Sequence, residues 1–254
     1  MEGESITAAT QRFYDAVARR NPDLAFLNYG FADPSASAGD MTPGEVADAS
    51  RRLYDAVLTG CEAGGRWLEV GCGRGGGAAF VLESRQVDEY LGLDLSNEHV
   101  RMCRDRFNGR AHAHVAVADA RSLPVAGAHF DVVFSVEAAQ HFEDRGAFYR
   151  DVARALKPGG RFHLASIWRR AEVDSPDTFD AAGLRVVDHV DITPNVVSSL
   201  AQSAGLRRQI VESLALPDRY TALLMSWAGV RGHEAFEGLA SGVLAYERFV
   251  LARA

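Results

Sequence analysis

Short apolar runs alternate with amphipathic stretches through the middle of the chain. The stretches have helical periodicity, and the runs have the length of strands. Strands that alternate with helices predict a parallel sheet covered by helices on both faces. The predicted strands in this region are Trp67–Val70, Tyr90–Leu95, His112–Val117, Phe130–Val136 and Arg161–Ile167.

The helix expected before the fifth strand covers Arg145–Leu156, with Phe148, Val152 and Leu156 at helical spacing. The sequence KPGG follows it directly. Proline and glycine interrupt helices, so we expect KPGG to end this helix and the fifth strand to begin after it.

Both ends of the chain depart from this alternation. A sixth strand, Leu184–Ile192, precedes a helix over Thr193–Ser213, a mixed and partly apolar segment over residues 214–239, and a closing strand, Val243–Leu251. The first 60 residues are predicted to form helices around a loop at Ala32–Gly44, which is rich in Pro, Gly, Ser and Asp.

The pattern as a whole predicts an α/β fold with a Rossmann-like, seven-stranded, mostly parallel sheet and helices on both faces. We expect a helical N-terminal lid at 1–60 and a core at 61–254. The core includes a helical cap, at about 193–240, inserted before the last strand.

Composition narrows the function classes. The 254 residues carry a net charge of −7 and no long basic stripe, which argues against a nucleic-acid partner. No apolar run is long enough to span a bilayer, and the N-terminus lacks the pattern of a signal peptide. Three cysteines without a C-x-x-C pair indicate a reducing compartment, so we expect a cytoplasmic protein without membrane contact.

The most informative segment is WLEVGCGRGGGAAF, residues 67–80. Gly71, Gly73 and Gly76 have G-x-G-x-x-G spacing between a predicted strand and helix. Such a turn offers free backbone N–H groups and lets a ligand approach the main chain. The spacing alone fits a nicotinamide dinucleotide as well as S-adenosylmethionine.

Three acidic residues accompany the glycine turn. Glu69 suits a cofactor with an ammonium and a sulfonium better than an anionic pyrophosphate, although backbone amides could equally satisfy it. Asp94 closes the second strand, where an acid can accept the ribose hydroxyls of either cofactor. Asp119 closes the third strand, and it could accept the adenine amine or cap a turn.

The order of these motifs resembles the class I S-adenosylmethionine-dependent methyltransferases. EVGCGRGGG, GLDLS, VADA, FDVVFSVEAAQHF and LKPGGRF follow one another as in that superfamily. LNYGFADP, DITPNVVSSL and YERFVLARA are similar to the branch that methylates polyketides, glycosides and lipids, including phthiotriolone-, erythromycin- and rifamycin-type enzymes. The resemblance spans nearly the whole chain, and none of its motifs specifies a substrate.

The resemblance implies S-adenosylmethionine as cofactor and a small-molecule acceptor. The predicted cofactor-binding residues are Tyr29, Glu69, Gly71, Cys72, Gly73, Asp94, Leu95, His99, Asp119, Ala120 and Val136.

His141 is the candidate general base for a hydroxyl acceptor, since it follows the fourth strand and histidine titrates near neutral pH. Some relatives carry the histidine one position earlier, where this chain has Gln140, and His141 could instead pack or cap a helix. No histidine pair has the spacing of a metal site on a helix, so no metal is expected.

Three functions remain compatible with the sequence. The first is O-methylation of a largely apolar natural product in secondary-metabolite or antibiotic biosynthesis, with C-methylation as a variant. The second is a non-methylating cyclase on the same fold. The third is an NAD(P)-dependent oxidoreductase, which the single lysine disfavours because no Tyr-x-x-x-Lys pair occurs. A homodimer is possible for each of them.

Overall fold

The computed structural model describes residues 15, 18–20, 24–35, 39–61 and 63–254. The first expected N-terminal helix falls largely outside these residues. The second is α2, Pro43–Val57, which begins with a capping box: Thr42 accepts from the backbone N–H of Glu45, and the Glu45 carboxylate accepts from that of Thr42.

The centre of the molecule is a seven-stranded sheet in the order β3-β2-β1-β4-β5-β7-β6. β1 to β5 pair in parallel, and β7 runs antiparallel between β5 and β6. The predicted mostly parallel, seven-stranded sheet is therefore confirmed. The strands are β1 Arg66–Val70, β2 Glu89–Asp94, β3 Ala113–Val117, β4 Phe130–Val136, β5 Leu156–Arg169, β6 Leu184–Asp191 and β7 Leu244–Arg253.

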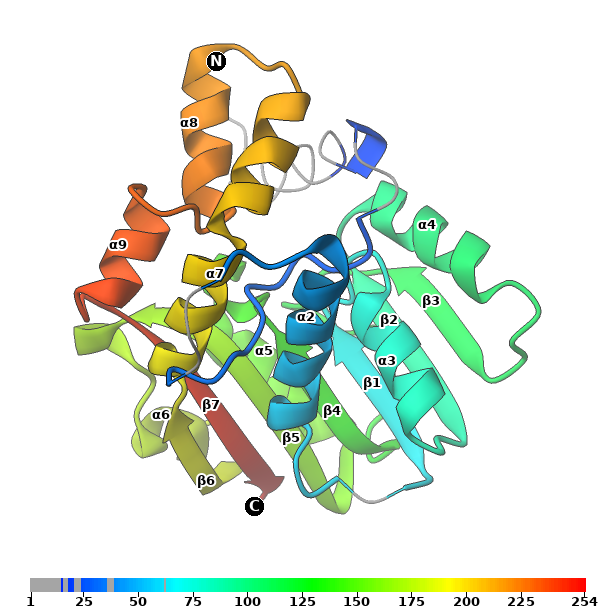
Figure 1. Ribbon diagram of the computed structural model, residues 1–254. Coiled ribbons are helices and arrows are strands. Elements are labelled where there is room, and N and C mark those ends of the chain that lie inside the picture. Colours follow the sequence, from blue (N-terminus) through cyan, green and yellow to red (C-terminus); the bar gives the residue numbers. More distant parts are fainter. Residues whose placement is uncertain (1–14, 16–17, 21–23, 36–38, 62) are drawn as a thin grey trace, which may run out of the picture.

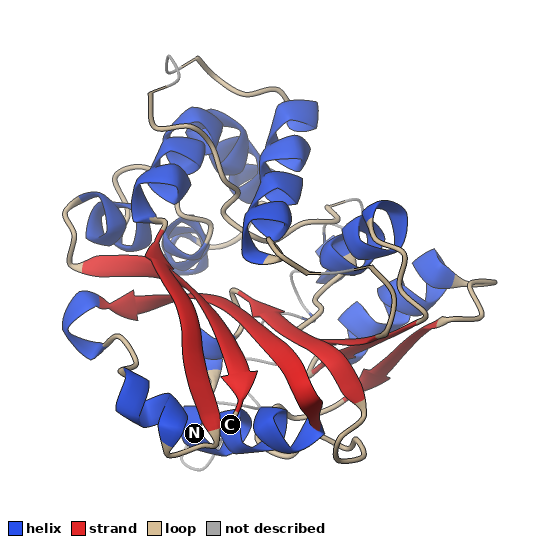
Figure 2. Ribbon diagram, turned by 90° about the horizontal axis from the view of Figure 1, so that it is seen from below, coloured by secondary structure: helices blue, strands red, loops and turns tan. Residues whose placement is uncertain are grey.

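Helices cover both faces of the sheet (Figure 2). Neighbouring strand residues point to opposite faces, so Trp67 and Leu68 belong to two different core clusters. One cluster includes residues of α2, α3 Gly76–Ser84, α4 Asn97–Phe107 and α7 Thr193–Ser213. The other includes residues of α5 Arg145–Ala155 and α6 Pro176–Asp180.

The fifth strand begins earlier than expected. The helix does end before KPGG, at Ala155, but strand pairing starts at once with Leu156 opposite Phe130. It resumes with Arg161 opposite Val132, so residues 157–160 bulge from the ladder. The Lys157 ammonium bonds the Asp131 carboxylate across this bulge at 2.7 Å. KPGG is therefore a bulge within β5 and not a spacer before it.

The mixed segment at 214–239 forms two helices, α8 Asp218–Trp227 and α9 Glu234–Ala240. α8, α9 and the later turns of α7 stand beyond the end of the sheet that lies opposite the C-terminus, while the first turns of α7 pack against the sheet (Figure 1). Short 3-10 helices at Ala139–His141 (η1) and Arg170–Glu172 (η2) complete the described elements. No helix in the described part of the chain is long and apolar enough to cross a lipid bilayer.

Candidate active site

A cavity of about 340 Å³ opens at the carboxyl ends of the parallel strands. Ligands bind at this edge in open α/β sheets. Its wall comes from segments far apart in the chain: residues 25–29, 70–74, 93–96, 118–121, 136–138, 140–143 and 226–227, with single residues from several helices. The glycine turn, the lid and the helical cap therefore meet around one space.

The glycine turn requires its glycines. Gly71 and Gly73 have φ angles of +82° and +54°, in the left-handed region that side chains disfavour. A Cβ atom on Gly71 would lie 2.3 Å from the Cβ of Ala138, which follows β4. The turn can pass this close to β4 only because residue 71 lacks a side chain.

Asp94 joins the second strand to the glycine turn. Its Oδ2 accepts from the backbone N–H of Gly73 at 2.8 Å, and its Oδ1 accepts from that of Ser96 at 2.9 Å. The Nδ1 of His99 lies 3.2 Å from Oδ1. A carboxylate offers about four acceptor positions, so Asp94 holds the loop and retains capacity for a ligand hydroxyl.

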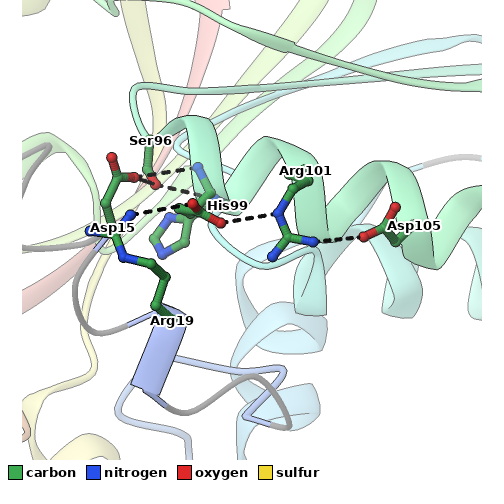
Figure 3. Close-up of polar contacts among 7 residues, drawn as sticks. Asp15, Arg19, Ser96, His99, Arg101 and Asp105 are labelled. Atoms are coloured by element: carbon green, nitrogen blue, oxygen red, sulfur yellow. Dashed lines mark hydrogen bonds and ion pairs between the residues drawn. The ribbon is translucent and has the colours of Figure 1, made fainter.

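The N-terminal segment docks beside Asp94, at the start of α4 (Figure 3). The Asp15 carboxylate accepts from the Ser96 hydroxyl and from the backbone N–H of Glu98 at 3.3 Å. Arg19 pairs with the Glu98 carboxylate at 3.2 Å. An acid at a helix N-terminus is favourable because free N–H groups and the helix dipole attract it.

Asp119 lines the cavity, but Arg121 already binds it. The guanidinium donates to both Asp119 oxygens, with the shortest contact at 2.7 Å, and it also pairs with Glu143 at 3.0 Å. Bonding to Arg121 lowers the pKa of Asp119. The acid predicted to meet an adenine amine therefore shares its oxygens with an arginine that sequence reasoning passed over.

Glu69 does not lie where we expected. Its side chain is fully buried and is not part of the cavity wall. Its oxygens accept from the hydroxyls of Tyr54, at 3.3 Å, and of Tyr90. Burial raises its pKa to about 8. Glu69 therefore lies behind the cavity wall, and the predicted direct contact with the cofactor is not formed. The reason is that two tyrosines, from α2 and β2, donate hydrogen bonds to its carboxylate.

The other predicted cofactor residues do line the cavity. His99 is buried beside Asp94, and the lid residue Tyr29 is buried with its hydroxyl donating to the Trp227 carbonyl at 2.8 Å. All of the predicted set except Glu69 is brought together there: Tyr29, Gly71, Cys72, Gly73, Asp94, Leu95, His99, Asp119, Ala120 and Val136.

His141 ends η1 and also lines the cavity. Its side chain is exposed because the cavity opens to solvent, yet the protein around the ring lowers its pKa. Gln140 is held by two hydrogen bonds, since its Oε1 accepts from Ser166 and its Nε2 donates to the Glu137 carbonyl at 2.9 Å. Gln140 and His141 both belong to the cavity wall.

Two further groups in the wall were not among the predicted site residues. Glu137 follows β4 with its carboxylate directed to the lid, where Oε1 accepts from the Tyr29 N–H at 2.7 Å. Trp227 and Ser226 end α8 and close the far side. Helical periodicity in this region indicated only an apolar face. Leu224 and Met225 form a small core with Val211, and Leu223 is exposed.

The cavity is suited to S-adenosylmethionine on its own geometry. Gly73 lines the cavity without a side chain, and the nearest atom to a built Cβ there is 3.9 Å away, so a methionine chain can lie against the turn. Carboxylates stand at the ends of β2 and β3, where ribose hydroxyls and an adenine amine require acceptors. Among the described residues, no group of three or more His, Cys, Asp or Glu could hold a metal ion.

Comparison with known proteins agrees with this geometry. A family model described as "Methyltransferase domain" matches residues 68–164. The chain is 30% identical to the fatty-acid O-methyltransferase of Mycolicibacterium smegmatis, covering 91% of this chain and 84% of that one. It is 28% identical to the phthiotriol/phenolphthiotriol dimycocerosates methyltransferase of Mycobacterium tuberculosis, covering 90% and 85%.

Among solved structures, the [4+2]-cyclase SpnF superposes with a TM-score of 0.73 over 96% of this chain and 94% of that chain. At 21% identity this likeness concerns the fold. The family match and the two relatives exclude the oxidoreductase alternative. The chain belongs to the class I S-adenosylmethionine-dependent methyltransferases, in the branch that includes mycobacterial lipid methyltransferases.

Proposed function

We propose that this methyltransferase transfers its methyl group to a hydroxyl of a small, largely apolar natural product such as a polyketide, a glycoside or a lipid. The names of the two relatives, which refer to a fatty acid and to a phthiotriol lipid, support an apolar acceptor. The cavity supports it too, because Phe142, Ile167 and Trp227 contribute to its wall.

The observation that carries the proposal is the position of His141. It borders the same cavity as the glycine turn and the lid, just beyond the end of β4. An imidazole with a lowered pKa is neutral at physiological pH and can accept a proton. A hydroxyl acceptor has to lose one proton during methylation, and His141 is our candidate to take it.

The residues of the protein bind the cofactor, orient the acceptor and exclude water. S-adenosylmethionine supplies an electrophilic methyl group, and in-line transfer requires the acceptor oxygen to be held opposite the sulfur. We assign cofactor binding to the glycine turn, Asp94 and Asp119, and we assign the closing of the cavity to Tyr29 and Trp227. The hydrogen bond between Tyr29 and Trp227 supports this, because it joins the lid to α8.

The described residues of the N-terminal lid, residues 1–60, and the helical cap at about 193–240 form, in this proposal, two covers around the acceptor. Hydrogen bonds between them support the arrangement. The Ser199 hydroxyl donates to the Tyr29 carbonyl at 2.8 Å, and the Asn195 amide donates to the Ala32 carbonyl at 3.1 Å. An acceptor held between two such covers is shielded from water during transfer.

The test is mass spectrometry of products from a panel of hydroxylated apolar acceptors, incubated with S-adenosylmethionine. A product heavier by one methylene unit and carrying a methyl ether is expected. A methyl group on carbon would indicate the C-methylating alternative. A product of unchanged mass, with a new ring, would indicate the cyclase alternative.

A further inference from the structure

Glu137 has an unusual backbone conformation for its residue type. Its φ is +54°, in the left-handed region, and it follows the last residue of β4. Its N–H donates to the Ala165 carbonyl at 2.9 Å, so the turn is held by β5. Such conformations are strained and concentrate at functional sites. The left-handed turn places the Glu137 carboxylate beside the lid.

The two carboxylate oxygens of Glu137 have different surroundings. Oε1 accepts from the Tyr29 backbone N–H at 2.7 Å and from the Tyr246 hydroxyl at 2.9 Å. Oε2 accepts no hydrogen bond from the residues that the structure describes, and Glu137 is part of the cavity wall. One oxygen is thus fixed by the protein, and the other is available to a bound molecule.

The nearest cation does not neutralise this carboxylate by direct bonding. Arg207, on α7, donates to the carbonyls of Asn28 and Ala228 and to the Ser203 hydroxyl, at 3.0, 3.1 and 2.8 Å. Its guanidinium also stacks over the Tyr29 ring, 5.6 Å from the centroid. Its charge acts on Glu137 only through space.

Glu137 also stands between the glycine turn and the lid. Its neighbour Ala138 lies against Gly71 in the cofactor turn, and its carboxylate binds the lid at Tyr29. The carboxylate therefore lies between the two parts of the cavity wall that must enclose the cofactor and the acceptor. The reacting oxygen of an acceptor can belong to a neutral hydroxyl or to a carboxylate. A negative group at this position discriminates between them, because like charges repel strongly where water is excluded.

We propose that Glu137 is a specificity-determining residue that admits neutral acceptors to the cavity and rejects acceptors with a carboxylate. This inference rests on the proposed function, in which the acceptor is a hydroxyl. It adds that the Glu137 carboxylate excludes acceptors whose reacting oxygen belongs to a carboxylate. His141 keeps the role of base, and Glu137 sets the charge that the acceptor meets.

The discrimination depends on pH. Burial raises the pKa of Glu137 to about 7, against the opposing effects of the Tyr29 N–H, the Tyr246 hydroxyl and Arg207. Tyr54 from α2 is the other titratable group that interacts with this carboxylate. Rejection is therefore complete above this pKa and weakens as the pH falls through it, because the neutral acid no longer repels an anion.

The experiment compares two probes that differ in one charge, oleic acid and methyl oleate. Calorimetry with the S-adenosylhomocysteine complex at about pH 8.5 measures both affinities. We expect the wild type to bind oleate at least about tenfold more weakly than methyl oleate. Glu137→Gln keeps the size of the side chain and removes the charge, so it should remove most of this difference and leave methyl oleate affinity unchanged.

Two further variants guard against a merely structural effect. Glu137→Asp retains the charge and should retain the preference for methyl oleate. Glu83→Gln removes an acidic group from the exposed surface of α3, outside the cavity wall, and should behave as the wild type. Lowering the pH to about 6 should reduce the difference between the oleate and methyl oleate affinities in the wild type, and should not change it in Glu137→Gln.

An unchanged ratio of the two affinities in Glu137→Gln would overturn the inference. So would a loss of S-adenosylhomocysteine affinity without any change in the ratio, since Glu137 would then belong to the cofactor site. Failure of the proposed function has a different signature. In that case methyl ricinoleate, which adds a hydroxyl to the same chain, gives no methyl ether with the wild type, whatever the binding ratio.

Discussion

The carboxylate of Asp94 accepts a hydrogen bond from the backbone N–H of Gly73 at 2.8 Å. This contact fixes the end of β2 to the glycine turn, so the acid expected to bind ribose also shapes the loop that we expect to bind the methionine chain. Substitutions at this residue should affect cofactor affinity through both roles.

Asp94→Ala is therefore expected to weaken S-adenosylmethionine binding by about 1.5–3 kcal/mol, the range for hydrogen bonds to charged groups. Isothermal titration measures it. Asp105→Ala on the exposed surface of α4 is the control, because Asp105 contacts only Arg101 among the described residues. Equal affinities for the two variants would mean that the cofactor site is misplaced.

Gly71→Ala should abolish measurable cofactor binding. The new Cβ would meet that of Ala138 at 2.3 Å, and the left-handed backbone would add strain. Gly109→Ala separates the two effects, since Gly109 has a φ of +86° with nothing within 4 Å of a built Cβ. We expect this control to lose about 1–2 kcal/mol of stability and no cofactor affinity. A Gly71→Ala protein that binds the cofactor normally would contradict the close approach of the turn to β4.

His141→Ala should leave cofactor affinity intact and lower turnover by roughly 10²–10⁴-fold, the usual effect of losing a positioned base. In the wild type, turnover should rise with pH through a value below 6.5, because the protein around the partly exposed ring desolvates it and lowers the pKa of His141, and only the neutral ring accepts a proton. The His141→Ala variant should lack this rise of turnover with pH. His112→Ala, exposed at the foot of β3, is the control. Near-normal turnover in His141→Ala would assign catalysis to positioning alone, or to an acceptor that needs no base.

The raised pKa of Glu69 predicts that the stability of the folded protein depends on pH. Its folded-state pKa of about 8 lies above the ordinary value of 4.5, so the folded protein binds its proton more tightly than the unfolded chain. Its contribution is complete below the unfolded pKa and is lost as the pH rises through about 8.

Glu69→Gln cannot ionise, so its free energy of unfolding relative to wild type should rise by about 2–3 kcal/mol between pH 6 and pH 8. Urea denaturation at both pH values measures the change. Glu83→Gln, on the exposed surface of α3, should follow the wild type at both pH values. If the free energy of unfolding changed equally with pH in Glu69→Gln and in the wild type, Glu69 would ionise normally in the folded protein.

The sequence by itself determined the sheet and its order of elements. Apolar runs bounded by glycine, proline and caps are local signals, and the seven strands appear where such runs occur. The glycine spacing and the acids at two strand ends likewise indicated the cofactor site, because backbone topology alone brings the carboxyl ends of parallel strands together. The bulge at KPGG escaped prediction, since pairing with β4 decides where a strand begins.

Only the tertiary structure decided which acids face the ligand. Glu69 and Glu137 each adjoin a strand end, yet Tyr54 and Tyr90 hold the first behind the wall, and a left-handed turn directs the second toward the lid. Nothing within either local sequence distinguishes them, because their partners come from positions far along the chain, such as Tyr246 on β7. Burial and hydrogen bonding between distant segments set both the direction and the charge of a side chain, and these depend on the folded arrangement as a whole.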